Sequence, residues 1–121
     1  MTIALWITAI LLTVLYLLAG SMKTITSKEK LQPNMAYVED FSAVQVKSIG
    51  GLELLGALGV ILPLATGIAP IVTGIAAIGL VLVQVGAITV HIRRKEQQSL
   101  PINVALLLLA AAVAVLRFAT L

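Results

Sequence analysis

Four long apolar runs are the feature that most constrains how this 121-residue chain folds. A transmembrane helix needs about 20 predominantly apolar residues, and such runs lie at about 3–22, 43–62, 69–91 and 101–119. Only 11% of the residues are charged, whereas soluble domains carry about a quarter. Because lipid offers no hydrogen-bond partners to the backbone, the spans must be helices. We therefore expect an all-α membrane protein, with residues 1–121 forming a single four-transmembrane-helix bundle in the lipid bilayer.

The basic residues predict the orientation of this bundle. Seven of the eight Lys and Arg residues lie in or beside the connections 23–42 and 92–100, whereas Arg117 lies on the opposite side. Since basic residues accumulate on the cytoplasmic side, we expect both connections to be cytoplasmic and both termini to lie outside the cell membrane. The first run lacks a preceding basic residue and exceeds the apolar core of about 7–15 residues in a signal peptide, so we expect it to remain as a span.

The first connection is the only long polar stretch, and it has two recognisable parts. Ser42 and Gln45 have the spacing of a capping box, which predicts that the second helix begins just after Ser42. Residues 35–41 mix apolar and aromatic side chains with polar ones, a composition typical of the membrane interface. We expect an interfacial first loop, with a docking surface for a partner protein as the alternative.

Polar side chains converge in the half of the bundle next to these two connections. With Lys47 at the boundary, Glu53 lies roughly 9 Å inside a hydrocarbon core of about 30 Å. Counted from Arg93, Gln84 lies roughly 13 Å and His91 roughly 3 Å inside. Each span also has one face that carries its polar or small residues, and these faces are expected to meet. The candidate ligand pocket consists of Tyr16, Lys23, Glu53, Gln84, His91 and Asn103.

The purpose of Glu53 stays open at this level. Ionisable side chains within a membrane are costly, usually interior and usually paired, so we expect Glu53 to pair with Lys23, Lys47 or His91. Such a pair either locks two helices together or forms part of a ligand or proton site; an exposed interfacial carboxylate is the third reading. The alternative for His91 is an interfacial or helix-capping residue, and the alternative for Tyr16 is an aromatic side chain that only packs.

Several functions are excluded or disfavoured by what the sequence lacks. The chain has no cysteine and one histidine, so we expect no metal site and no pair of histidine ligands for haem. It has no recognisable serine–histidine–acid constellation, so we do not expect catalysis by this chain alone. No basic array extends into water, which argues against a nucleic-acid partner.

Glycines are concentrated on the second and third spans. Small residues let transmembrane helices approach closely, so their expected role is packing, with room for a ligand or a second subunit as the alternative. They are Gly50, Gly51, Gly56, Gly59, Gly74, Gly79 and Gly86.

Five segments together resemble the DoxX-like family. They read "LLAGSMK", "VEDFS", "GGLELLGALGVILP", "TGIAP" and "VGAITVHIRRKE" and extend over nearly the whole chain. The resemblance implies a small four-helix membrane protein, and the family takes its name from a subunit associated with a quinol oxidase and with thiosulfate:quinone oxidoreduction. It therefore implies an accessory subunit of a membrane redox system that binds a quinone or another lipid. Some relatives are linked to oxidative-stress complexes and others resemble assembly chaperones, so a client protein is the alternative. A homo-oligomeric exporter of small solutes is a third.

Overall fold

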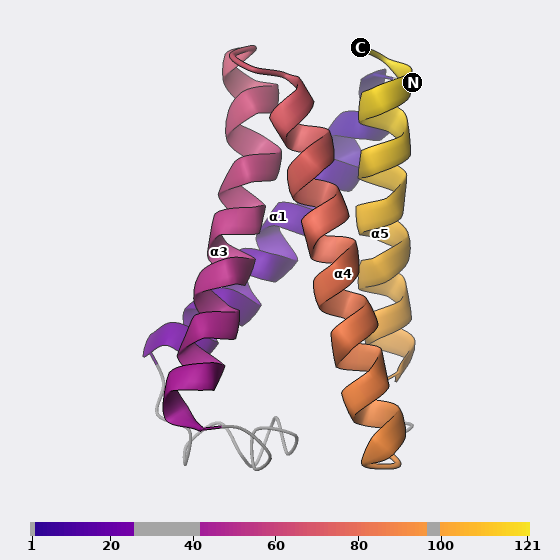
Figure 1. Ribbon diagram of the computed structural model, residues 1–121. Coiled ribbons are helices and arrows are strands. Elements are labelled where there is room, and N and C mark those ends of the chain that lie inside the picture. The colour runs from indigo at the N-terminus through magenta and orange to yellow at the C-terminus, as the bar shows by residue number, and fades with distance from the viewer. Residues whose placement is uncertain (1, 26–41, 97–99) are drawn as a thin grey trace.

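The computed structural model describes residues 2–25, 42–96 and 100–121, which form four α-helices (Figure 1). The helices are α1 (Thr2–Ile25), α3 (Ala43–Thr66), α4 (Ile71–Arg93) and α5 (Leu100–Ala119). All four are long and apolar enough to cross a membrane. The expected all-α fold with four spans is therefore confirmed, whereas the expected interfacial loop at residues 26–41 lies outside the described residues.

The helices surround a common centre in the order α1, α3, α4, α5. Helix α1 packs against α3 and α5, and α4 packs against the same two helices. Helices α1 and α4 therefore face each other diagonally across the bundle. Helix α1 runs obliquely behind the other helices, from α5 at one end to α3 at the other (Figure 1). Both termini and the α3–α4 connection lie at one end, and α3 and α4 diverge toward the opposite end (Figure 1).

Helix α3 begins as expected but ends later than expected. Ser42 Oγ accepts from the Gln45 N–H at 3.1 Å, and Gln45 Oε1 accepts from the Ser42 N–H at 2.9 Å, which confirms the capping box. The predicted end at residue 62, before Pro63, is wrong because the helix continues to Thr66. A proline removes one backbone hydrogen bond, a loss that membrane helices tolerate. The helix ends at Gly67, whose φ of 74° suits glycine.

Helix α4 begins two residues later than the sequence predicts. The expected run was 69–91, but the helix is Ile71–Arg93 because Ala69 takes a left-handed φ of 48°. A left-handed residue cannot belong to a right-handed helix. Pro70 is the N-cap, and its fixed φ leads into the first turn. In α5, Pro101 lies in the first turn as expected.

Four of the seven glycines on α3 and α4 have the expected packing role. A Cβ at Gly50 would lie 2.9 Å from the Gly20 carbonyl oxygen, so α1 and α3 cross with their backbones close together. A Cβ would also meet a neighbouring side chain at Gly56, Gly59 and Gly74. In contrast, no neighbouring atom lies within 4 Å of the Cβ position at Gly51, Gly79 or Gly86.

Candidate functional site

A buried ion pair joins α1 to α3. Lys23 Nζ lies 2.6 Å from Glu53 Oε1, and Glu53 is only 2% exposed. Glu53 is therefore interior and paired, so the exposed interfacial reading is wrong and pairing with Lys23 is confirmed. Lys47, a second predicted partner, instead donates from Nζ to the Thr24 carbonyl at 2.8 Å. A cation at this position interacts favourably with the negative, C-terminal end of the α1 helix dipole.

The close crossing of α1 and α3 explains how the ion pair forms. Gly20 and Gly50 bring the two backbones together, and Lys23 and Glu53 each follow their glycine by three residues. Positions three residues apart share a helical face, so both side chains leave the crossing on the same side. Burial of two opposite charges in contact largely offsets the cost that either charge would have alone in a membrane.

A second polar contact crosses the bundle diagonally from α1 to α4. Gln84 Nε2 donates to the Tyr16 hydroxyl oxygen at 2.5 Å. Tyr16 is fully buried and Gln84 is 3% exposed. Because its oxygen accepts this hydrogen bond, Tyr16 still has a hydroxyl proton to donate. Tyr16 is thus both a packing aromatic and a polar group of the interior, which combines the two alternatives that the sequence left open.

Two oxygen atoms near this contact have unused hydrogen-bonding capacity. Within the part of the chain that the structure describes, Gln84 Oε1 and Thr13 Oγ1 are buried without a hydrogen-bond partner. Thr13 lies one turn before Tyr16 on the same face of α1. A buried acceptor without a partner costs about 1–3 kcal/mol. The interior therefore offers an acceptor at Gln84, a donor at Tyr16 and a hydroxyl at Thr13.

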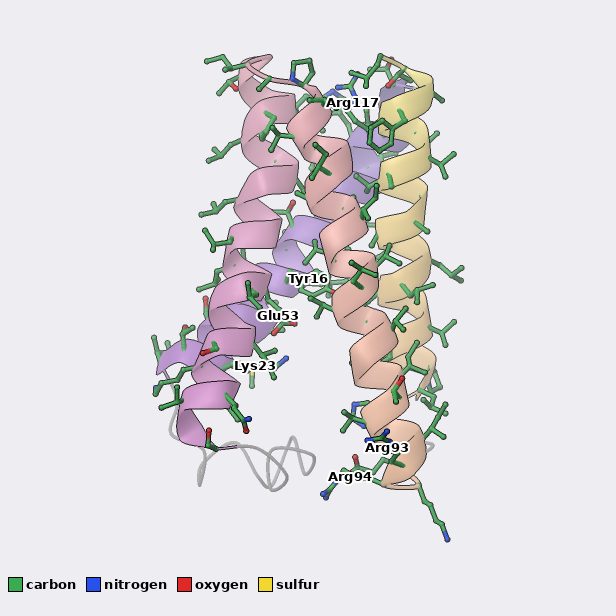
Figure 2. All side chains as sticks on the ribbon, in the orientation of Figure 1. Tyr16, Lys23, Glu53, Arg93, Arg94 and Arg117 are labelled. Atoms are coloured by element: carbon green, nitrogen blue, oxygen red, sulfur yellow. The ribbon has the colours of Figure 1, made fainter. Side chains whose placement is uncertain are left out.

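The two contacts belong to one polar group, which we call the central polar group and define as Thr13, Tyr16, Lys23, Glu53 and Gln84. Tyr16 and Lys23 lie two turns apart among the buried residues of α1, on the same face of the helix. In Figure 2, Tyr16, Glu53 and Lys23 follow one another from mid-height of the bundle toward the end where α3 and α4 diverge. The group therefore extends from the middle of the bundle toward the end where α3 and α4 diverge.

The last two predicted site residues lie nearer that boundary. His91 is 7% exposed in the last turn of α4, and its Nδ1 lies 3.0 Å from Glu96 Oε1. Arg94 Nε lies 3.2 Å from the same oxygen. The Glu96 N–H donates to the His91 carbonyl at 2.9 Å, so this cluster closes the end of α4, which favours the capping role for His91. Asn103 is buried on α5 at 8% exposure.

Sequence reasoning gave no role to three polar residues. Thr13 lies three residues before Tyr16 on the polar face of α1, and this spacing could have marked Thr13 as a residue of the interior. Thr73, fully buried, donates from Oγ1 to the Val60 carbonyl at 2.8 Å and ties α4 to α3; no pattern marks this contact in the sequence. Glu96 lies beyond the helix in a charged stretch, so its return toward His91 depends on the local turn. Among the described residues, no three His, Cys, Asp or Glu side chains group as metal ligands.

Four apolar spans around a buried polar group define a small multi-pass integral membrane protein. The sequence model of the DoxX-like family matches residues 7–113. The chain therefore belongs to the DoxX-like family, which confirms the resemblance seen in the sequence. Comparison with curated proteins and with solved structures found no match.

Proposed function

We propose that this protein binds the polar head of a quinone-like amphiphile at the central polar group, as an accessory subunit of a membrane redox system. The observation that carries the proposal is the unused hydrogen-bonding capacity of Gln84 and Thr13 in a buried, membrane-embedded interior. Nearly all buried polar atoms in proteins have a partner, and an exception calls for an explanation. A bound polar head supplies one.

The chemistry of the group suits a quinone or quinol head. The Tyr16 hydroxyl donates to a quinone carbonyl, and Gln84 Oε1 accepts from a quinol hydroxyl. The Gln84 side-chain amide is held against the Tyr16 hydroxyl through its Nε2, so the two groups address neighbouring positions of the ligand. The Lys23–Glu53 pair holds α1 against α3 at the adjoining level and contributes charge near the head.

The division of labour with a partner follows from the composition. The chain has no cysteine and one histidine, so it offers neither thiolates nor a histidine pair for a redox centre. In the proposed function, this chain binds and orients the amphiphile, and a separate membrane protein exchanges electrons with it. In the proposed orientation, the central polar group lies in the cytoplasmic half of the membrane.

Binding of a short-tailed benzoquinone to the protein in lipid nanodiscs tests the proposal. We expect saturable binding that weakens about tenfold in both Tyr16→Phe and Gln84→Leu, since each loses one hydrogen bond to the head. Thr13→Val and Thr89→Val form a matched pair, because Thr13 Oγ1 is buried without a partner whereas Thr89 bonds within its own helix at 2.8 Å. Only Thr13→Val should weaken binding.

Two results would count against this function. If the wild-type protein shows no saturable binding, the claim that it binds a quinone is refuted. If Thr13→Val and Thr89→Val have equal effects, the claim that the ligand binds at the central polar group is refuted. If a membrane protein of stable composition co-purifies and loses abundance on deletion, with no quinone bound, the assembly-factor alternative takes precedence.

A further inference from the structure

Gln84 carries an acceptor that the described residues leave unsatisfied. Its Nε2 donates to the Tyr16 hydroxyl oxygen at 2.5 Å, so its Oε1 lies on the other branch of the same amide. Among residues 2–25, 42–96 and 100–121, no group donates to this buried oxygen. An amide oxygen only accepts hydrogen bonds, so a donor on a ligand or on a solvent molecule is needed to satisfy it.

The surroundings of Gln84 make an unsatisfied acceptor costly. Gln84 is 3% exposed, and the apolar residues Leu80 and Ile88 lie one helical turn to either side of it on α4. On α1, Leu12 lies one turn before Tyr16 and is fully buried. An apolar environment strengthens a completed hydrogen bond and raises the cost of a missing one. The affinity of the interior for a ligand therefore depends on whether that ligand donates to Gln84 Oε1.

The donors of the central polar group, in contrast, serve a ligand oxygen of either kind. Tyr16 has a hydroxyl proton to donate, because its oxygen accepts from Gln84. Thr13 Oγ1 is buried without a partner in the described part of the chain, so its proton is also available. Five other threonines instead donate to the carbonyl four residues earlier, a bond that occupies the hydroxyl. They are Thr8, Thr24, Thr66, Thr89 and Thr120.

The amide geometry allows one ligand hydroxyl to bridge Gln84 and Tyr16. Bond lengths place Oε1 roughly 2.2 Å from Nε2, so Oε1 lies within about 4.7 Å of the Tyr16 oxygen. A ligand oxygen at about 2.7–2.8 Å from both atoms spans this separation. A hydroxyl at this position donates to Gln84 Oε1 and accepts from Tyr16, whereas a carbonyl accepts from Tyr16 and leaves Gln84 Oε1 unpaired.

We infer that Gln84 makes the central polar group selective for the reduced, hydroxyl-bearing form of the head, a quinol, over the corresponding quinone. This inference rests on the proposed function and extends it, because it assigns the redox state of the ligand that the site prefers. Gln84 is the specificity-determining residue, and Tyr16 binds the head oxygen in both states. We expect the quinol to bind about tenfold more tightly, since the quinone leaves one buried acceptor unsatisfied.

Selective binding of the quinol also changes the redox potential of the bound couple. Reduction of the quinone adds two electrons and two protons to the head, and the electrons come from the partner membrane protein of the proposed function. Because the product of reduction binds more tightly than the reactant, the bound couple has a higher midpoint potential than the free couple in the same lipid. A tenfold ratio of affinities corresponds to about 30 mV for a two-electron couple. The wild-type protein alone gives this readout, so it does not depend on the folding of a variant.

Anaerobic titration of tetramethylbenzoquinone and of its quinol into nanodiscs measures the two affinities, each corrected for partition into empty nanodiscs. Tyr16→Phe should weaken both forms about tenfold and keep their ratio, because Tyr16 donates to the head in either state. Gln84→Leu removes an N–H donor that serves both forms and an acceptor that serves only the quinol. The quinone should therefore weaken about tenfold and the quinol about a hundredfold, so that their ratio falls to about one.

Thr89→Val is the control, because Thr89 is exposed and bonds within its own helix at 2.8 Å; it should leave both affinities unchanged. Equal affinities of quinol and quinone for the wild-type protein, with an unshifted midpoint potential, overturn the selectivity and leave the proposed function standing. A water molecule retained on Gln84 Oε1 gives this same result, because water donates to that oxygen whichever form is bound. A ratio that survives Gln84→Leu overturns the assignment to Gln84. If neither form binds saturably, the proposed function fails as well.

Discussion

The strongest prediction concerns the buried ion pair between Lys23 and Glu53. Insertion scales assign about 2.5–3.5 kcal/mol to each charge at the centre of a membrane helix, or about 5–7 kcal/mol for two. At the observed 2.6 Å, Coulomb attraction with an effective dielectric constant of about 20 is about 6 kcal/mol. The attraction and the insertion cost therefore nearly cancel. The pair as a whole contributes little net stability, although each charge depends strongly on the other.

The perturbation is a double-mutant cycle with Lys23→Met and Glu53→Leu, which replace each charge by an apolar side chain of similar size. Each single variant removes the attraction and leaves one charge buried, so we expect about 3–5 kcal/mol of destabilisation. The double variant removes both charges and should lie within about 1 kcal/mol of the wild type, because replacing a buried pair by apolar residues is often neutral. The coupling energy should thus exceed about 5 kcal/mol.

Reversible unfolding in mixed detergent micelles, followed by helical circular dichroism, measures these free energies. Lys47→Met is the matched control, because Lys47 is exposed and donates to the Thr24 carbonyl at the end of α1; we expect a loss of at most about 1 kcal/mol. The reasoning is refuted if the losses of the two single variants add in the double variant. It is also refuted if either single variant is as stable as the wild type.

Three further predictions follow from the packing and the topology. Gly50→Ala should destabilise the bundle by about 1–3 kcal/mol, because its Cβ would meet the α1 backbone at 2.9 Å; in the same unfolding assay Gly51→Ala, in open space, should cause no loss. Thr73→Val should cost about 0.6 kcal/mol by removing the α4–α3 hydrogen bond, and a loss above about 2 kcal/mol would indicate another role. The chain has no cysteine, so Lys95→Cys and Ile68→Cys can each be labelled alone in intact cells. In the proposed orientation an impermeant maleimide labels only Ile68→Cys, and the reverse pattern contradicts it.

The candidate site was partly predictable from spacing. Depth counting and helical facing grouped Glu53, Lys23 and Gln84 correctly as interior residues, because both follow from the fixed rise and periodicity of a helix. The choice among three partners for Glu53 did not follow, since it depends on which helices are neighbours and how closely they cross. The Tyr16–Gln84 contact joins diagonal helices, and no periodicity within one helix predicts a diagonal partner.

The helix ends, too, were predictable where they depend on nearby residues and not where they depend on the wider structure. The capping box of α3 was predictable because it involves only residues three apart, Ser42 and Gln45. The continuation of α3 past Pro63 was not, since one lost hydrogen bond is outweighed by the favourable burial of another apolar turn in the membrane. The left-handed conformation of Ala69 belongs to the turn between α3 and α4 and shifted the start of α4.

The sequence by itself determined the solvent and the architecture of this protein. Apolar runs of membrane length cannot be covered in water, and lipid forces each of them to be a helix. Only the tertiary structure decided which polar atoms meet, which atoms have unused hydrogen-bonding capacity, and where the surface is hollow. The physical reason is that helix order, crossing distance and tilt arise from side chains packing between helices. A glycine that closes the α1–α3 crossing at Gly50 and one that borders an open groove at Gly79 look alike in the sequence and differ only in their neighbours.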